Sequence, residues 1–163
     1  MKRFEGIGKN MMVADKYFKM YLKDALKPYG LNAAEGIILL MMYRNDSGNS
    51  KGFPAEQNGK TQDELIKEIH YDKGVMTRTM KELEEKGFVM RNQHPADSRS
   101  FLFSLTEKGT EFKQTLVRIL REWNAVLLEG IDSDELERTE AVLEMMSKNA
   151  ALFYNGKSKK NNK

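Results

Sequence analysis

The stretch TQDELIKEIHYDKGVMTRTMKELEEKGFV, residues 61–89, decides the fold. Thr61 and Glu64 have the spacing of a capping box, in which each side chain accepts a hydrogen bond from the other residue's amide, so they predict the start of a helix. A second helix is predicted to begin after Asp72 and to end at Lys86–Gly87. Two short helices joined by a turn of about three or four residues have the spacing of a helix-turn-helix.

The residues after this motif predict a β-hairpin. Residues 88–91 form a first strand, and the side chains of residues 101–105 alternate in a way that predicts a second strand. The polar residues 92–98, which include Pro95, predict the turn between them. A hairpin directly after a helix-turn-helix is a wing, so the sequence predicts a winged helix-turn-helix.

Long helices are predicted before and after this core. Residues 9–27 carry apolar side chains near a helical period and are followed by a proline and a glycine that end the helix. A second helix over residues 31–43 is predicted to be capped by Asn32 and to be buried on several sides. Residues 45–60 show no periodicity and predict a long loop, which is either a functional segment or a tolerated surface insertion.

The C-terminal third adds two more helices. Thr106 is predicted to cap a long helix with apolar side chains at intervals of three and four, and Asp132 or Ser133 starts a final helix. These helices and the first one carry more apolar surface than a small winged core can cover, so we expect a second copy of the chain as partner. The expected fold is therefore mostly α with a small β-hairpin wing, divided into an N-terminal dimerisation helix (1–30), a winged helix-turn-helix core (31–109), C-terminal dimerisation helices (110–155) and a disordered basic tail (156–163).

The composition excludes several classes of protein. The 163 residues include no cysteine, which rules out disulfides, thiolate metal sites and a cysteine redox switch. Neither a glycine-rich phosphate loop nor a cluster of histidine with carboxylates is present, so we do not expect an enzyme. The longest apolar run, Ile37–Tyr43, is too short to cross a bilayer. We expect a cytoplasmic protein with no cofactor and no metal, in which His70 and His94 are solvated.

Positive charge is segregated along the chain. There are 27 Lys and Arg residues against 24 Asp and Glu, and the basic ones are concentrated in residues 1–27, 73–99 and 157–163. A local positive face can follow DNA phosphates while acidic parts of the molecule face elsewhere.

These features together resemble the MarR (multiple-antibiotic-resistance regulator) family of winged-helix transcription factors. The resemblance rests on five motifs that occur in the family's order and spacing: Thr61–Leu65, Asp72–Arg78, Leu83–Val89, Asp97–Arg99 and Ser104–Gly109. Two features depart from the family pattern. The loop at 45–60 is longer than usual, and the basic residues of the wing are only Arg91, His94 and Arg99.

The second helix of the motif is the candidate recognition helix, whose N-terminal half must face the major groove. Val75, Met76, Met80 and Leu83 are expected on its buried side. Arg78 is the candidate for reading guanine with two hydrogen bonds, and Thr77 is expected to contact either a thymine methyl group or a phosphate. Lys73 is expected to contact a phosphate, and Gly74 allows close approach of the backbone. The full set of candidate residues on this helix is Lys73, Gly74, Val75, Thr77, Arg78 and Lys81.

Arg99 is the candidate residue of the wing. The resemblance implies that it enters the minor groove, where narrow A·T stretches concentrate negative potential. Asp97 is expected to hold its guanidinium through a forked ion pair. The competing interpretation is a hairpin-stabilising ion pair without DNA contact. At the start of the first helix of the motif, the amides of Thr61 and Gln62 are expected to hold a phosphate.

The predicted function is that of a homodimeric, sequence-specific DNA-binding transcriptional regulator of a pseudo-palindromic operator in double-stranded DNA. The resemblance implies a repressor released by a small aromatic ligand. The alternatives are a ligand-blind regulator and a winged helix that binds proteins. The candidate residues of a ligand pocket are Tyr17, Tyr21, Tyr29, Met41, Met42 and Trp123, although core packing explains each of them equally well.

Overall fold

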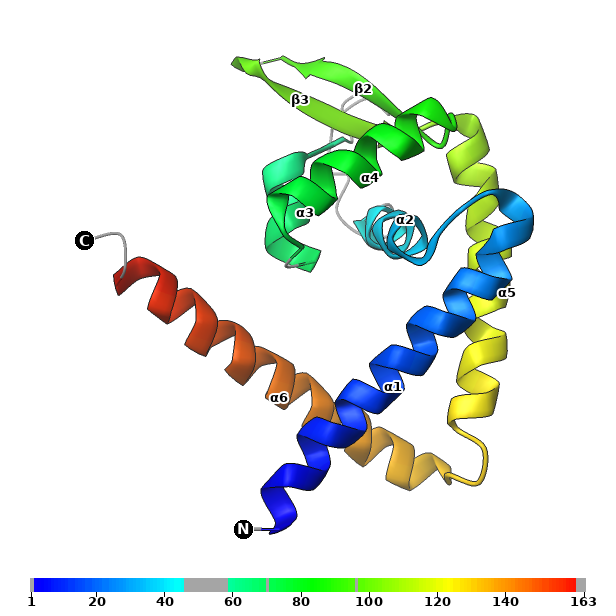
Figure 1. Ribbon diagram of the computed structural model, residues 1–163, viewed down its shortest axis with the longest axis vertical. Coiled ribbons are helices and arrows are strands. Elements are labelled where there is room, and N and C mark those ends of the chain that lie inside the picture. The colour runs from blue at the N-terminus through cyan, green and yellow to red at the C-terminus, as the bar shows by residue number, and fades with distance from the viewer. Residues whose placement is uncertain (1, 46–58, 70, 96, 161–163) are drawn as a thin grey trace. The chain divides into compact units, whose positions relative to one another are not determined.

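The computed structural model describes residues 2–45, 59–69, 71–95 and 97–160 (Figure 1). Its helices are α1 (Lys2–Leu26), α2 (Ala33–Asn45), α3 (Gln62–Ile69), α4 (Lys73–Glu85), α5 (Glu107–Leu127) and α6 (Ser133–Lys160), with a 3₁₀ turn η1 (Lys27–Tyr29). Its strands are β1 (Lys60–Thr61), β2 (Val89–His94) and β3 (Asp97–Leu105). The chain forms two compact units, Met1–Trp123 and Asn124–Lys163. This mostly helical architecture with a small sheet confirms the predicted fold class.

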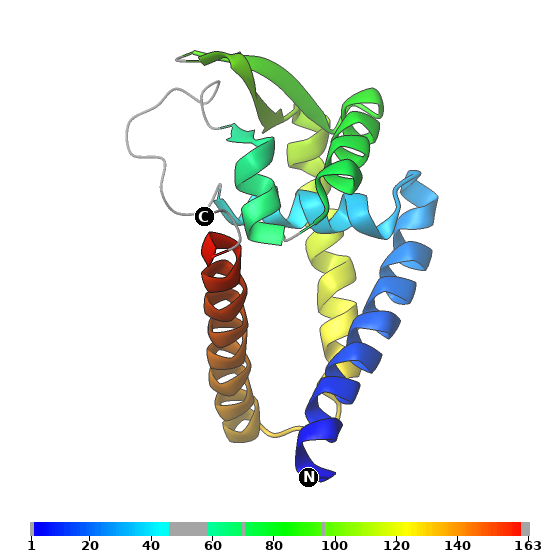
Figure 2. The same cartoon turned by 60° about the vertical axis from the view of Figure 1, so that its left-hand side comes forward.

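The wing is longer than the sequence predicts. β2 pairs with β3 in antiparallel register from Val89 opposite Leu105 to His94 opposite Asp97. The predicted turn at 92–98 is therefore wrong, because most of these polar residues belong to the strands. They pair through backbone groups, and because this outer part of the hairpin is mostly exposed, it has no need of alternating apolar side chains. In Figures 1 and 2 the hairpin projects past the helices of the first unit.

A third strand, β1, was not predicted. Lys60 lies opposite Phe103 and Thr61 opposite Leu102, which places β1 on the other side of β3 from β2. Two residues are too few to show an alternating pattern, so nothing in the sequence distinguishes β1 from the preceding loop. The rest of that predicted loop, residues 46–58, lies outside the described residues.

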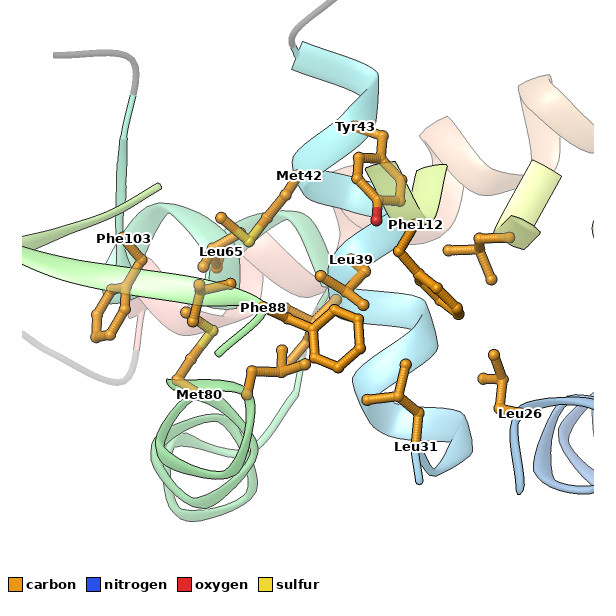
Figure 3. Packing of buried hydrophobic residues seen from close by; sticks show 14 of the residues in the cluster. Leu26, Leu31, Leu39, Met42, Tyr43, Leu65, Met80, Phe88, Phe103 and Phe112 are labelled. Carbon is orange, nitrogen blue, oxygen red and sulfur yellow. The ribbon is translucent and has the colours of Figure 1, made fainter. Parts of the chain in front are cut away.

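The hydrophobic core of the first unit joins α2, α3, α4, α5 and the sheet. Leu39, Leu65 and Leu83 are fully buried. Phe88 enters this core directly after α4, and its ring centre lies 5.3 Å from that of Phe112 in α5 (Figure 3). The junction between α4 and β2 is therefore fixed by aromatic packing as well as by the backbone.

Four predicted N-caps are confirmed, but two helices are longer than predicted. Hydrogen bonds from backbone amides to the side chains of Asn32, Asp72, Thr106 and Asp132 confirm them as N-caps. However, α1 begins at Lys2 rather than near residue 9, and α6 continues to Lys160 through part of the tail predicted to be disordered. Neither stretch contains a proline, and adding a residue to an existing helix is far easier than starting one.

Candidate nucleic-acid interface

The start of α3 is held by the predicted capping box. The Thr61 amide donates to Glu64 Oε2 at 2.7 Å, and the Glu64 amide donates to Thr61 Oγ1 at 3.3 Å. The hydrogen bond from the Thr61 amide lowers the pKa of Glu64. The Thr61 amide is therefore engaged by a carboxylate, and a phosphate at this helix start would have to take the place of that carboxylate.

The C-terminal end of α4 is anchored to α2 by a buried ion pair. Lys86 Nζ lies 2.6 Å from Glu35 Oε1, and the Glu35 side chain is fully buried. The second carboxylate oxygen of Glu35 accepts the Asn32 amide at 2.7 Å, so both oxygens have partners. Gly87 follows with a φ of 74°, and the Phe88 amide donates to the Leu83 carbonyl, as in a Schellman motif. This anchor was not predicted; the one signal for it in the sequence is a glutamate at the start of an otherwise apolar helix.

The structure places the candidate residues of α4 on its exposed face. Met76, Met80 and Leu83 are buried as predicted, but Val75 is 43% exposed, so its expected burial is wrong. The first turn of α4 lies outside the core, and the helix enters the core only at Met76. Thr79 is buried as well, and its hydroxyl has a partner there because it donates to the Val75 carbonyl at 2.9 Å.

Gly74 has a structural reason to be glycine. Its amide donates to Asp72 Oδ1 at 2.8 Å, and a Cβ atom at Gly74 would lie 3.0 Å from that same oxygen. A larger residue would therefore press on the N-cap that starts α4. This role adds to the predicted one, in which glycine allows close approach of the backbone.

Thr77 is tied to both helices of the motif. Its hydroxyl donates to the Lys73 carbonyl at 2.8 Å and accepts a hydrogen bond from Gln62 Nε2 of α3. Lys81, one turn further along α4, lies 3.5 Å from Glu85, and both of these side chains are mostly exposed. An exposed pair of this kind contributes little to stability, so Lys81 is available to another anion.

In the wing, the two arginines are held in different ways. The Arg91 guanidinium lies over the Phe101 ring, 3.5 Å from its centre. The Arg99 amide donates to Asp97 Oδ1 at 3.0 Å, and within the described residues no ion pair joins the two side chains. The predicted forked ion pair is therefore wrong, because Asp97 caps the backbone at the start of β3 instead.

A hollow of about 410 Å³ brings most of these residues together; we call it the α4–wing groove. Six predicted site residues line it, namely Thr61, Gln62, Lys73, Thr77, Lys81 and Arg99. Gly74, Val75, Arg78 and Asp97 are not among its lining residues. Arg91 and Phe101 do line it and were not predicted as site residues. The register of the hairpin, which the sequence does not provide, is what makes them diagonal neighbours.

Comparison with known proteins gives the same fold for nearly the whole chain. A MarR transcriptional regulator from Methanosarcina mazei Go1 is 28% identical, with 90% of this chain and 96% of that chain covered and a TM-score of 0.79. The HTH-type transcriptional regulator BilQ of Clostridioides difficile (strain CD3) is 29% identical over 122 residues, which are 75% of this chain and 74% of BilQ. The family model described as "MarR family" matches residues 55–101.

The chain is thus similar to MarR-family regulators, in fold over nearly its whole length and in sequence over residues 55–101. It is a DNA-binding transcriptional regulator with a winged helix-turn-helix, not an enzyme. A MarR family transcriptional regulator from Listeria monocytogenes, solved in complex with a 26mer DNA, shares the fold with a TM-score of 0.76 at 22% identity and covers 89% of each chain. The matched residues 55–101 include α3, α4, β2 and the beginning of β3, so the family resemblance is strongest at the α4–wing groove.

None of the six predicted ligand-pocket residues lines the α4–wing groove. The rings of Tyr21 and Trp123 lie 5.3 Å apart between α1 and α5, and the Tyr21 hydroxyl donates to the Ile119 carbonyl. Tyr29 packs edge-on against Phe112, and Met42 belongs to the core. Tyr17 is 53% exposed, and Met41 is half-buried.

Two further features are absent from the described part of the chain. Within it, no group of three or more His, Asp or Glu residues is placed to hold a metal ion. No helix in that part is long and apolar enough to cross a membrane. His70 lies outside the described residues.

Proposed function

We propose that this protein is a homodimeric repressor whose two copies of α4 and the wing read a pseudo-palindromic operator in double-stranded DNA. The observation that carries the proposal is the α4–wing groove, whose lining contains Lys73 and Lys81 of α4 and Arg91 and Arg99 of the hairpin, beside the acidic Asp63 and Glu84. Four cations beside the exposed face of a recognition helix fit the phosphates on either side of a major groove.

In this proposal Arg78 reads the bases. It is exposed on α4 and has no ion-pair or hydrogen-bond partner among the described residues, so its guanidinium is available for O6 and N7 of guanine. Lys73 and Lys81 contact phosphates, and Arg99 enters the minor groove from the wing. Gln62 lies at the start of α3, and its side-chain amide donates a hydrogen bond to the Thr77 hydroxyl.

The exposed apolar side chains of each unit support a dimer. In α1, Met12 is 75% and Tyr17 is 53% exposed; in α6, Leu152 is 72% and Phe153 is 63% exposed. Large apolar side chains that gather on one element, outside any core, are typical of an association surface. Pairing with a second copy brings two recognition helices to one operator.

The test begins with selection of a binding sequence from a random DNA pool, followed by affinity measurements at two salt concentrations. We expect Arg78→Ala to lose at least about tenfold in affinity for the selected sequence, as for loss of a bidentate base contact, with nearly unchanged binding to random DNA. Arg121→Ala, which removes an exposed arginine from α5, is the matched control. Enrichment of no sequence would overturn the proposal in favour of a winged helix that binds proteins.

Release by a ligand is tested on the same complex. A panel of phenols and aromatic carboxylates is added to the protein bound to its selected sequence, and free DNA is measured. A ligand acts only through different affinities for the DNA-bound and free states, so an active compound must also bind more weakly when DNA is present. If none of the panel releases DNA, the protein is a regulator that does not respond to this class of ligand.

A further inference from the structure

The hydroxyl of Thr77 narrows what this residue is able to recognise. Thr77 lies on the exposed face of α4 and lines the α4–wing groove. A threonine at this position has two ways to contact DNA, since its hydroxyl bonds a phosphate or a base edge and its methyl group packs against thymine. The hydrogen bonds of the hydroxyl decide between them.

A threonine hydroxyl has one proton to donate and two lone pairs to accept with. In Thr77 the proton is donated to the Lys73 carbonyl at 2.8 Å, and one lone pair accepts from Gln62 Nε2. Phosphate oxygens only accept hydrogen bonds. Thr77 therefore has no proton to offer a phosphate unless it gives up its bond to its own helix.

We propose that Thr77 is a specificity-determining residue that recognises thymine by contact between its Cγ2 methyl group and the C5-methyl group of the base. This inference rests on the proposed function, because it needs α4 in the major groove. The C5-methyl group is displayed there by thymine and by none of the other three standard bases. Gln62 and the Lys73 carbonyl both hold the hydroxyl, so the side chain keeps one rotamer and presents its methyl group in a fixed direction.

The experiment removes the methyl group either from the thymine base or from Thr77. Each thymine of the selected sequence is replaced in turn by deoxyuracil, which lacks only the C5-methyl group, and affinity is measured for the wild type, Thr77→Ser and Thr77→Val. Burying one methyl group corresponds to about fourfold in affinity. We expect the wild type to discriminate thymine from uracil by about this factor at one position of each half-site.

The two variants separate the methyl group from the hydroxyl. Serine keeps the hydroxyl and lacks the methyl group, so Thr77→Ser is expected to lose the discrimination at that position. Valine keeps a methyl group and lacks the hydroxyl, so Thr77→Val is expected to retain the discrimination. Thr110→Ser is the matched control, because Thr110 is also exposed and donates to the carbonyl four residues earlier, at 2.9 Å, but lies on α5.

Two results would overturn the inference while leaving the proposed function intact. The first is a wild-type protein that binds its selected sequence and shows no thymine-to-uracil effect at any position. The second is thymine-to-uracil discrimination that survives unchanged in Thr77→Ser, which would mean that another residue contacts the C5-methyl group. If selection enriches no sequence at all, the proposed function fails and this inference fails with it. Melting temperatures of both variants show whether they are folded.

Discussion

At the scale of single residues, the two arginines of the wing differ: the side chain of Arg91 is fixed, whereas in Arg99 only the backbone is held. The Arg91 guanidinium lies over the Phe101 ring, whereas the side chain of Arg99 is exposed and the Arg99 amide donates to Asp97. A guanidinium on an aromatic face is preorganised, so less rotamer freedom is lost when it meets an anion. An exposed arginine side chain is free to extend toward a groove. We therefore propose that Arg99, and not Arg91, is the arginine of the wing that enters the minor groove.

Replacing Arg99 by alanine is expected to weaken binding to the selected DNA sequence by about tenfold or more, with little change in melting temperature. The alanine retains the amide that Asp97 bonds, so the wing keeps its shape. Fluorescence anisotropy with labelled DNA measures the first quantity and thermal unfolding the second. Equal DNA affinity in wild type and variant would remove Arg99 from the interface, and a large fall in melting temperature would make its role structural.

At the scale of elements, α4, the proposed recognition helix, is held at both ends by polar contacts that the apolar pattern does not reveal. Asp72 caps its beginning, and Lys86 ties its end to Glu35 at the start of α2. Gly87 then turns the chain, so that Phe88 enters the core and the wing follows directly. The ion pair between Glu35 and Lys86 thus fixes the end of α4 on α2, and the packing of Phe88 against Phe112 fixes the start of the wing.

Lys86→Met is expected to destabilise the protein by about 2 kcal/mol, because it leaves the buried Glu35 carboxylate without its cation. Partial exposure of Lys86 keeps the cost below that of a fully buried pair. Urea unfolding measures the change. The matched control is Lys19→Met, which breaks an exposed pair with Asp15 and is expected to cost no more than about 0.5 kcal/mol. Equal costs for the two variants would contradict the anchoring role.

The capping box at α3 makes part of the stability depend on pH. The pKa of Glu64 is lowered in the folded state, first by the hydrogen bond from the Thr61 amide, so the unfolded chain binds a proton more readily there. The stabilisation is complete above the ordinary glutamate pKa and is lost as pH falls through the lowered value. We expect the stability difference between wild type and Glu64→Gln to shrink on acidification, as measured by urea unfolding at several pH values. Glu137→Gln, at an exposed position of α6, should show no such trend.

At the scale of the whole molecule, each of the two units carries exposed apolar side chains. Exposed apolar surface does not stabilise a monomer, whereas burying it against a second chain would stabilise a dimer. The exposed apolar side chains of α1 and those of α6 belong to different units of the chain. In the sequence, α1 precedes the DNA-binding core and α6 follows it. In the proposed dimer, the two DNA-binding cores must be joined by elements outside the DNA-contacting surface, and we propose that α1 and α6 are these elements.

Placing a charge in either apolar set is expected to weaken the dimer. Met12→Glu and Leu152→Glu should each shift sedimentation equilibrium toward monomer by at least about tenfold in dissociation constant, because a carboxylate is costly to desolvate in an apolar interface. Thr139→Glu adds the same charge at an exposed polar position of α6 and is the matched control. A monomeric wild type at micromolar concentration would sink the homodimer proposal itself.

The sequence by itself determined the elements whose signals are local. Caps at Asn32, Asp72, Thr106 and Asp132 follow from one side chain and the amides two or three residues ahead, and the apolar stripe of α4 follows from helical spacing. These interactions form within a few residues, so their pattern is readable without a fold. The same local motifs, in register over 61–109, were enough to indicate the family.

Only the tertiary structure decided the features that join distant parts of the chain. The pairing of β1 with β3, the Glu35–Lys86 anchor and the stacking of Arg91 on Phe101 each depend on register or packing between elements. The exposure of Val75 and the engagement of the Thr77 hydroxyl by Gln62 are of the same kind. A residue's own type fixes which contacts it is able to make, but the free energy that selects among them comes from neighbours that only folding supplies.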